Sequence, residues 1–360
     1  MKSKKRIAII GTVGIPARYG GFETLAEQLV TRLSHEFSFT VFCSKKAYPK
    51  SERVKDNGQV KKIYLPLAAN GLQSIVYDVV SVIWGLFISD VLLVLGVSGA
   101  FILPVIKLFS RKKIILHIDG LEWKRAKWNG LAKKFLKASE AVGVRFADVI
   151  IADNEEIRNH IKSSYQCEGV LIEYGGDHVI TGNTNKQLTT AENGYAFSVC
   201  RIEPENNIEM ILQAFSTMPS RQLVLVGNWF NSQYSKALYE KYTQYPNLRL
   251  TPPIYDIKAL NELRQNCYMY VHGHSAGGTN PSLVEAMCLE LPVLAYSVNY
   301  NIYSTQSKAL YFSSASELVS VYQSVSDEKR AEVALDMKRV ADERYKWSII
   351  IAKYRDVFCI

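Results

Sequence analysis

A chain of 360 residues exceeds what one hydrophobic core usually organises, so its length predicts two domains. Its composition, 48% hydrophobic and 21% charged, excludes a disordered or fibrous protein. The net charge of +9 lies in residues 1–180, which hold 26 Lys and Arg against 17 Asp and Glu, and it favours anionic lipid or a phosphorylated acceptor as partner. No zinc-finger spacing or RNA-binding motif accompanies it, so nucleic acid is not expected.

Neither the cysteines nor the apolar stretches indicate export or a membrane span. Six scattered cysteines form no CxxC pair and no metal-ligand spacing, which predicts a reducing compartment and a cytoplasmic protein. The apolar run Ile7–Ile10 is too short for a signal peptide and is expected to be a buried strand. Three charged residues, Asp78, Asp90 and Lys107, divide the apolar stretch 75–109 into pieces shorter than the roughly 20 residues that cross a bilayer.

Short apolar runs alternate with amphipathic stretches along the first half, which predicts parallel strands covered by helices on both faces. Strands are expected at Ile7–Gly11, Ser38–Cys43, Lys62–Leu65, Val91–Val97, Lys113–Ile118 and Asp148–Ala152. Apolar residues at three- and four-residue spacing from Phe22 to Leu33 predict a helix after the first strand. Residues 1–180 are therefore predicted to be a doubly wound α/β domain.

The same pattern starts again after a polar stretch rich in Thr and Asn, 181–193, which is typical of an exposed linker. Strands are expected at Ala196–Cys200, Gln222–Val226, Asn247–Leu250, Tyr268–His272 and Pro292–Ala295. Helices are expected at Ile208–Phe215, Ile257–Asn266 and Ser282–Glu290. Residues 181–340 are thus predicted to be a second domain of the same class, followed by a terminal helix within 341–360.

Two loops between a strand and a helix have features of phosphate sites. The loop Gly11–Gly21 precedes a helix, where backbone amides and the helix dipole suit a phosphate, although a plain turn fits the loop about as well. GxGxxG does not align on its glycines, so a dinucleotide cofactor is not indicated. Arg201 follows a strand of the second half, where parallel sheets bind ligands, and a diphosphate suits it better than a surface ion pair.

The most informative segment is HGHSAGGTNPSLVEAM at 272–287. A strand end and a glycine-bearing loop are followed by typical first-turn residues of a helix, whose amides would hold a diphosphate. Glu285, about one turn in, is placed to accept hydrogen bonds from the hydroxyls of a sugar. No third ligand accompanies His272 and His274 at metal-site spacing, so a structural or acceptor-contacting role is favoured over a metal.

The motifs resemble family 4 glycosyltransferases with the GT-B fold, and within them a bacterial rhamnosyltransferase-like group whose N-terminal half is a domain formerly of unknown function. The matching segments span the chain in order: GIPARYGGFE at 14–23, HIDGLEWKRAKW at 117–128, ADNEEI at 152–157, EYGGD at 173–177, RIEPENN at 201–207 and HGHSAGGTNPSLVEAM at 272–287. The resemblance implies two Rossmann-like domains facing a cleft, with the helix of 341–360 packing back on the N-terminal domain.

The resemblance also implies a retaining, metal-independent transfer of a hexose from a nucleotide sugar, rhamnose from dTDP-rhamnose being the first expectation. The nucleotide sugar would bind chiefly to the C-terminal domain and the acceptor to the N-terminal one. A polyprenyl-diphosphate-linked saccharide of capsule or O-antigen biosynthesis is the implied acceptor, with the enzyme peripheral on the inner face of the plasma membrane. No cofactor or metal is expected, and the chain lacks a DxD sequence.

Residue roles carry over from the resemblance by position. The implied catalytic residues are Arg201, which would neutralise the diphosphate, and His117 and Asp119, near the reacting sugar and the acceptor hydroxyl. The implied donor-binding residues are Gly20, Gly21, Arg201, Asn206, Gly277, Gly278, Thr279, Asn280, Ser282 and Glu285, the last holding the ribose. Two positions depart from the broader family, because Gly277 stands where the first of two glutamates is usual and Asn206 where a lysine is usual.

The segment Trp123–Lys137 sets aromatic and aliphatic side chains beside six Lys and Arg residues. This composition suits contact with anionic lipid and equally an ordinary solvated helix, and the implied lipid-linked acceptor favours the membrane. Two other functions stay open: a sugar-nucleotide epimerase of the same fold, and a non-catalytic GT-B-like protein that binds a partner or polysaccharide. Incubation with nucleotide sugars and lipid acceptors distinguishes these functions. Sugar transfer indicates a transferase, epimerisation of the donor an epimerase, and no reaction a non-catalytic protein.

Overall fold

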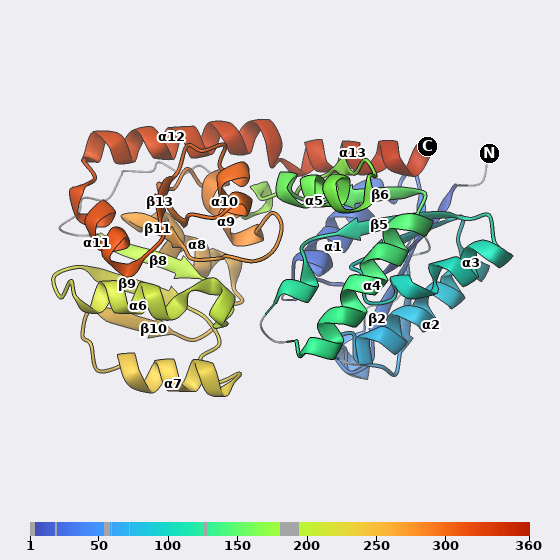
Figure 1. The fold of residues 1–360 in the computed structure, drawn as a ribbon, viewed down its shortest axis with the longest axis horizontal. Coiled ribbons are helices and arrows are strands. Elements are labelled where there is room, and N and C mark those ends of the chain that lie inside the picture. Colours follow the sequence, from blue (N-terminus) through green and yellow to red (C-terminus); the bar gives the residue numbers. More distant parts are fainter. Residues whose placement is uncertain are drawn as a thin grey trace. The chain divides into compact units, whose positions relative to one another are not determined.

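A computed structural model describes residues 4–18, 20–53, 58, 60–71, 73–125, 128–180 and 194–360. They form two compact units, which we call the N-terminal unit (Met1–Ile172 with Ser348–Ile360) and the C-terminal unit (Glu173–Trp347) (Figure 1). Each unit is built on one parallel sheet with helices packed on it, which confirms the expected α/β class. The expected linker 181–193 lies outside the described residues.

The sheet of the N-terminal unit has seven strands in the order β3-β2-β1-β4-β5-β6-β7. Its strands are β1 Arg6–Ile10, β2 Ser38–Ser44, β3 Val60–Leu65, β4 Val91–Leu95, β5 Lys113–Ile118, β6 Val149–Ala152 and β7 Val170–Leu171. Ile7 of β1 pairs with Phe39 on one side and Val91 on the other, where the strand order reverses. Six of these strands were predicted, whereas β7 was missed because two residues give no periodic signal.

Burial on both faces explains why these strands are continuous apolar runs. All five residues of β4 are buried, as expected for a strand covered by helices on both sides. The helices of the unit are α1 Gly21–Leu33, α2 Gln73–Ile88, α3 Leu103–Phe109, α4 Gly130–Phe146, α5 Glu155–Tyr165 and most of α13 Trp347–Cys359, with 3-10 turns η1 Lys50–Glu52, η2 Ala100–Ile102 and η3 Glu122–Lys124. Helix α1 buries the predicted face, including Leu25 and Leu29.

The basic segment Trp123–Lys137 does not form one helix. It consists of the turn η3 and the first half of α4, separated at Asn129. Asn129 caps α4, because its side-chain oxygen accepts a hydrogen bond from the amide of Ala132 at 2.9 Å. The apolar and basic residues of this segment are therefore divided between a turn and the first half of a helix, and do not form one amphipathic helix.

The sheet of the C-terminal unit has six strands in the order β10-β9-β8-β11-β12-β13. Its strands are β8 Tyr195–Val199, β9 Gln222–Val226, β10 Leu248–Thr251, β11 Met269–His272, β12 Val293–Tyr296 and β13 Leu310–Phe312. Its helices are α6 Ile208–Ser216, α7 Gln233–Tyr242, α8 Ile257–Gln265, α9 Pro281–Cys288, α10 Asn299–Ser304, α11 Ala315–Ser324 and α12 Asp327–Arg344, with 3-10 turns η4 Asp177–Val179 and η5 Pro204–Asn206. The expected strands and helices are all present, and β13, three residues long, was missed.

The boundaries between the units differ from those drawn from the sequence at residues 180 and 340. Glu173 belongs to the C-terminal unit, where its carboxylate accepts a hydrogen bond from Arg344 Nε at 2.9 Å. Trp347 belongs there too, because its indole Nε1 donates to His178 Nδ1 at 3.0 Å. The remainder of α13 lies in the N-terminal unit, where the Phe358 ring packs 5.6 Å from that of Phe37. A polar contact within the C-terminal unit thus accompanies each boundary, at Glu173 and at Trp347, and neither contact follows from a pattern in the sequence.

Helix α2 is the most apolar helix of the N-terminal unit and holds one buried acid. No described helix, α2 included, is long and apolar enough to span a membrane. Asp78 is only 4% exposed, and its carboxylate accepts a hydrogen bond from the Ser98 hydroxyl. Burial raises the pKa of Asp78 to about 7, although the Ser98 hydrogen bond lowers it.

The raised pKa of Asp78 predicts that the parent loses stability as the pH rises from about 4 to about 7, because the folded chain keeps a proton there that the unfolded chain releases. Asp78→Asn removes this titration. The variant should therefore gain melting temperature relative to the parent across that range, by the equivalent of a few kcal/mol on the order of the pKa shift. Thermal melts of both proteins over the pH series measure it, and a pH-independent difference would show that Asp78 is ionised in the folded chain.

Candidate functional site

The predicted donor residues gather at the carboxyl ends of β8 and β11. These strands are neighbours, with Ala196 opposite Met269, and the strand order reverses between them. Open α/β sheets bind ligands at such a reversal, because the loops on either side leave in opposite directions. The loop after β8 carries Arg201, and the loop after β11 leads to α9.

Arg201 presents its guanidinium to solvent at this edge. Its side chain is 44% exposed, and the nearest carboxylate oxygen, Glu203 Oε1, lies 3.7 Å from Nη1. That separation is longer than a hydrogen bond, so the ion pair restrains Arg201 only weakly. The guanidinium can therefore turn to an incoming diphosphate.

Asn206 joins the loop after β8 to the loop after β11. Its Nδ2 donates to the carbonyl of Arg201 at 2.7 Å, and its Oδ1 lies 2.7 Å from Nδ1 of His274. The side chain is buried and both of its polar ends are engaged. The structure thus gives Asn206 a bracing role between the loops, while a direct contact with the donor stays a prediction.

The backbone explains why position 277 is a glycine. Gly277 has φ +146°, a conformation that residues with a side chain rarely adopt. A Cβ there would also lie 2.7 Å from His274 Nε2. A glutamate does not fit this loop, so the carboxylate usual in the broader family has no place here. His274, held by Asn206, fills the adjoining space instead.

The start of α9 is capped by two of the predicted residues. The Asn280 side-chain oxygen accepts hydrogen bonds from the Ser282 amide at 3.0 Å and the Ser282 hydroxyl at 2.8 Å. Gly278 and the buried Thr279 complete the loop that leads into this cap. The positive end of the helix dipole lies at this loop, an environment that favours an anion.

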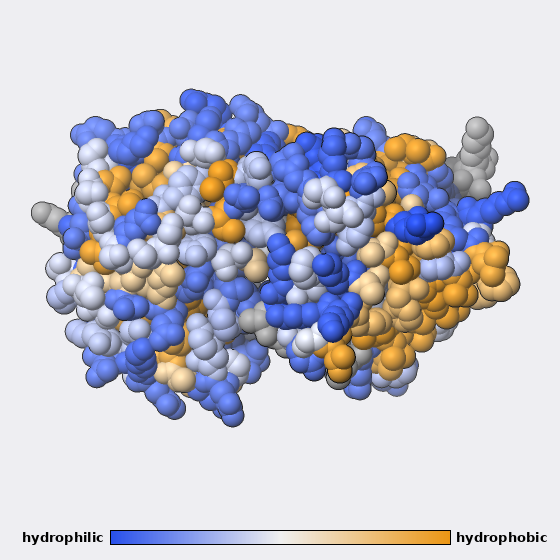
Figure 2. Space-filling view, viewed as in Figure 1, coloured by the Kyte–Doolittle hydropathy of each residue, from blue (hydrophilic) through white to orange (hydrophobic). Residues whose placement is uncertain are grey.

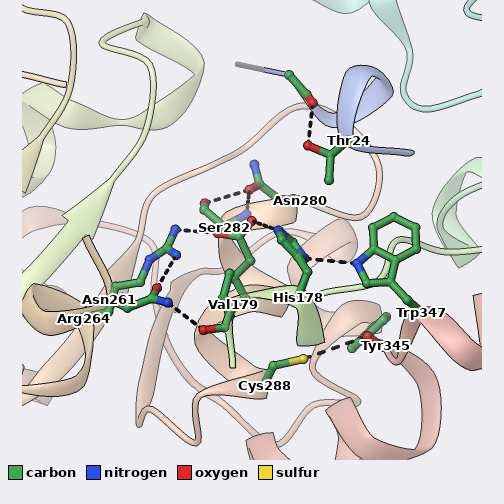
Figure 3. A network of polar contacts seen from close by, with 12 residues as sticks. Thr24, His178, Val179, Asn261, Arg264, Asn280, Ser282, Cys288, Tyr345 and Trp347 are labelled. Carbon is green, nitrogen blue, oxygen red and sulfur yellow. Dashed lines mark hydrogen bonds and ion pairs between the residues drawn. The ribbon is translucent and has the colours of Figure 1, made fainter. Parts of the chain in front are cut away.

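Glu285 of α9 is the centre of a polar network, and its partners Arg264 and His178 are labelled in Figure 3. Arg264 Nη2 donates to its Oε2 at 2.5 Å, and His178 Nε2 lies 3.5 Å from its Oε1. Because Trp347 Nε1 donates to His178 Nδ1, the proton of a neutral His178 is on Nε2, facing Glu285. The carboxylate is therefore fixed from two sides.

The network keeps Glu285 ionised although its side chain is only 13% exposed. Burial alone would raise the pKa of Glu285, but the Arg264 charge and the His178 hydrogen bond outweigh it and hold that pKa below its usual value. A carboxylate has about four acceptor positions, and these two partners leave others open. Glu285 can thus accept hydrogen bonds from a ribose while its orientation stays fixed.

Arg264 was not predicted from the sequence. It lies in the last turn of α8, where a cation usually faces solvent, yet its side chain is 3% exposed. Its Nη1 donates to Asn261 Oδ1 at 3.2 Å, and Asn261 Nδ2 donates to the Val179 carbonyl at 2.6 Å (Figure 3). No local pattern in the sequence signals that this arginine is buried against Glu285.

In the N-terminal unit, His117 lies buried at the carboxyl end of β5. Its Nδ1 lies 3.0 Å from the Tyr354 hydroxyl oxygen, within hydrogen-bond distance, whereas no described residue is a partner of its buried Nε2. The ring meets that of Phe22 edge-on at 5.4 Å. Burial lowers the pKa of His117 to about 3, so the imidazole is neutral at neutral pH. It is a hydrogen-bond donor and not a cation at neutral pH.

Asp119 and Tyr354 stand beside His117. Asp119 is partly exposed two residues further along, past the end of β5. Burial, followed by the charges of Asp153 and Asp119, raises the pKa of Tyr354 well above its ordinary value, so its hydroxyl stays protonated beside His117. The predicted pair His117 and Asp119 is thus brought to one sheet edge, oriented by a tyrosine from α13 that the sequence reading did not single out.

The glycine loop before α1 contains a carboxylate that was not expected. Glu23 is 7% exposed, and its Oε1 accepts a hydrogen bond from the Val13 amide at 2.9 Å. A Cβ on Gly20 would lie 1.7 Å from Glu23 Oε2. The space beside Gly20 therefore holds a protein carboxylate, and a phosphate arriving there meets negative charge. Contact of Gly20 and Gly21 with the donor phosphates stays a prediction, which this position of Glu23 disfavours.

Among the residues that the structure describes, no group of three or more His, Cys, Asp or Glu side chains is arranged as a metal site. His272 has no metal partner in this part of the chain. Its Nε2 is buried without a hydrogen-bond partner, and burial lowers the pKa of the ring to about 3. Like His117, it is a neutral residue at the carboxyl end of a central strand.

Each half of the chain matches a family model, and the fold is that of GT-B glycosyltransferases. Residues 181–306 match the family model described as Glycosyl transferases group 1, and residues 4–177 match a domain of unknown function, DUF1972. The chain thus carries a group 1 glycosyltransferase domain preceded by a DUF1972 domain, as the resemblance implied. Neither match tests the rhamnosyltransferase-like subgroup.

Solved structures share the fold over nearly the whole chain. Sucrose-phosphate synthase from Thermosynechococcus elongatus has a TM-score of 0.83 at 15% identity, covering 99% of this chain and 100% of that one. Anabaena HepE in complex with UDP-glucose has a TM-score of 0.72 at 14% identity, covering 99% and 100%. A glycosyltransferase from Rickettsia africae has a TM-score of 0.69 at 11% identity, covering 99% and 98%. A comparison with curated protein sequences found no match.

The Glu285–Arg264 pair predicts how the C-terminal unit responds to substitution. Glu285→Gln leaves the Arg264 charge buried without its counter-ion and should cost about 3–5 kcal/mol of stability. The double variant Glu285→Gln with Arg264→Gln should recover part of that loss, because no uncompensated charge remains. Denaturant unfolding of the single and double variants measures the coupling, and simply additive losses would contradict a direct ion pair.

Proposed function

We propose that this glycosyltransferase is a retaining, metal-independent enzyme that transfers a sugar, in the first instance rhamnose from dTDP-rhamnose, to a lipid-linked saccharide. One observation carries the proposal: in the region that matches group 1 glycosyltransferases, β8 and β11 are neighbouring strands, and Arg201 follows the carboxyl end of one while the loop to the capped start of α9 follows the other. HepE, which shares the fold, binds UDP and UDP-glucose, and we extend nucleotide-sugar binding to this edge of the C-terminal unit.

Arg201 and the helix dipole stabilise the leaving group. As the bond from the anomeric carbon to the diphosphate oxygen breaks, negative charge grows on the nucleoside diphosphate. A guanidinium and preorganised amides facing that charge lower the barrier, by several kcal/mol where water is excluded. The acceptor hydroxyl attacks from the face that the diphosphate leaves, and its proton passes to a phosphate oxygen of the leaving group. Configuration is retained, and no protein nucleophile or metal takes part.

Glu285, His117 and Asp119 position the two substrates. Glu285 accepts from the hydroxyls of the donor's ribose, in the orientation that Arg264 and His178 impose. The neutral His117 donates its Nε2 proton to a sugar hydroxyl, since it has no described partner for that atom. Asp119 faces the acceptor hydroxyl. Glu285 and the His117–Asp119 pair belong to different units, one for the donor and one for the acceptor.

A lipid-linked acceptor fits the distribution of charge. The excess of Lys and Arg lies in the acceptor-side half of the sequence, which suits a polyprenyl diphosphate and an anionic bilayer. We therefore place the enzyme at the inner face of the plasma membrane in capsule or O-antigen biosynthesis. Purified protein incubated with nucleotide sugars and lipid-linked saccharides tests this function: transfer supports it, whereas epimerisation of the free donor, or donor binding without reaction, overturns it.

Transfer should continue in excess chelator, because Arg201 and the α9 dipole supply the charge that a metal would otherwise supply. Rates in EDTA and in EDTA overtitrated with Mg²⁺ or Mn²⁺ measure this. Equal rates are expected. Loss of transfer in EDTA that either ion restores would show that the mechanism needs a metal.

Arg201→Ala should lower kcat by about 100-fold or more, since a charge on the leaving diphosphate goes unopposed in the transition state. The fold should be unaffected, because the side chain is exposed and weakly paired. Arg339→Ala is the matched control, an exposed arginine of α12 paired with Asp336, and should transfer at the parent rate. A near-parent rate for Arg201→Ala would make Arg201 an ordinary surface residue.

A further inference from the structure

Large apolar side chains are exposed together on one face of the N-terminal unit. The space-filling view shows this patch over α2 and α3 (Figure 2). We call it the apolar face. Its members are Val76, Ile83, Trp84 and Phe87 of α2, Phe101 of η2, and Val105, Leu108 and Phe109 of α3, with exposures from 39% to 81%.

The apolar face is an unusual solvent surface. On α2 the exposed large residues recur on one side of the helix, and Asp78, the charged residue of α2, is buried on the other side. Three of the side chains, Phe87, Leu108 and Phe109, are 77% to 81% exposed, so most of their surface is open to solvent. A contiguous apolar surface of this kind marks a site of association.

The two helices are fixed to one another by polar contacts beneath this surface. The hydroxyl of Ser98, which precedes η2, donates to Asp78 in the middle of α2. Lys112, which follows α3, donates to the carbonyl of Ser89 at the end of α2. The apolar face is therefore presented as one rigid surface.

A basic hollow adjoins the apolar face at the end of α3. Phe109 belongs to both, and Lys5, Arg111, Lys112 and Lys113 line the hollow together with Asp90. Asp90 is already paired with Arg6 at 2.7 Å, and three of the lysine ammonium groups donate to backbone carbonyls, which carry no net charge. The hollow thus has an excess of positive charge. Burial lowers the pKa of Lys113, and the charge of Lys5 contributes to the same shift.

We infer that the apolar face docks into the interface of an anionic phospholipid bilayer, with lipid phosphates in the basic hollow. Charge complementarity selects this occupant: an isologous dimer through the same face would bring the basic borders of two copies together, whereas acidic headgroups neutralise them. Helix α4, which packs against α3 and carries Lys133, Lys134 and Lys137, adds cations beside the face.

In this inference the apolar face contacts the membrane, and the aromatic residues of Trp123–Lys137 do not. The indole of Trp123 donates to Glu140 at 3.1 Å, and that of Trp128 to Glu122 at 3.0 Å. Both indoles are therefore engaged within the unit, whereas the side chains of the apolar face stay exposed among the residues that the structure describes. The inference rests on the proposed function only in that a lipid-linked acceptor gives the enzyme a reason to bind a bilayer.

Vesicle binding tests the inference without any transfer assay. Full-length parent protein should bind phosphatidylglycerol-containing vesicles, more weakly as salt rises, and hardly bind phosphatidylcholine alone. The variant Phe87→Ser, Leu108→Ser, Phe109→Ser should bind about 100-fold more weakly, because three exposed side chains no longer enter the apolar layer. Brominated lipids should quench Trp84 fluorescence, and Trp84→Phe should abolish most of the quenching.

Matched variants identify the surface responsible. Phe230→Ser with Leu335→Ser removes exposed apolar side chains from the C-terminal unit and should bind vesicles as the parent does. Lys133, Lys134 and Lys137 replaced by Glu should weaken binding while Trp84 quenching persists in the bound fraction. Parent-like vesicle binding by the Phe87, Leu108, Phe109 variant would overturn the inference. The inference would also be wrong if the parent did not bind vesicles but formed a dimer that this variant disrupts.

The same experiments keep this inference separate from the proposed function. If the parent binds vesicles through the apolar face but transfers nothing to lipid-linked saccharides, the proposed acceptor is wrong and the docking surface stands. If it transfers sugar to a detergent-solubilised lipid acceptor but does not bind vesicles, the proposed function stands and the docking surface is wrong.

Discussion

The parallel direction of every strand is the constraint from which the candidate site follows. In a parallel sheet all carboxyl ends emerge at one edge, so the loops that follow neighbouring strands meet there. In the C-terminal unit this brings the loop with Arg201 against the loop with His274, and Asn206 closes the gap between them. In the N-terminal unit the same rule places His117 and Asp119 at one edge. A few side chains far apart in sequence thus become neighbours without any special local motif.

The site depends on charges that are compensated inside the protein. The Glu285 side chain is only 13% exposed, and without Arg264 and His178 this burial would raise the pKa of its carboxylate. In turn Arg264, nearly inaccessible to solvent, requires Glu285. Such a pair contributes little net stability, but it fixes a carboxylate in one orientation and one ionisation state. The arrangement suits a residue that has to distinguish the hydroxyls of a ribose.

The sequence determines the main elements more clearly than the contacts between them. Strands such as Gln222–Val226 were predicted with their observed bounds, because a strand covered on both faces is a continuous apolar run. Positions at strand ends, such as Arg201 and His117, could be proposed for the same reason. Arg264, Glu23 and Tyr354 could not be found this way. Their respective partners, Glu285, the Val13 amide and His117, are 10 or more residues away in the sequence. The glycine at 277 was read as a missing glutamate, whereas its backbone and His274 leave no room for one.

The way the chain leaves and re-enters the N-terminal unit has a consequence for its biosynthesis. Residues of α13 are translated after the whole C-terminal unit, yet Lys5 binds the Phe358 carbonyl at 2.8 Å and His117 is oriented by Tyr354. Translation therefore passes the end of the C-terminal unit before it supplies the tyrosine that orients His117. Proteolytic loss of the residues that follow Trp347 would remove Tyr354 from His117 and leave the contacts around Glu285 in place. The environment of His117 is thus completed by a segment that follows the C-terminal unit in the sequence.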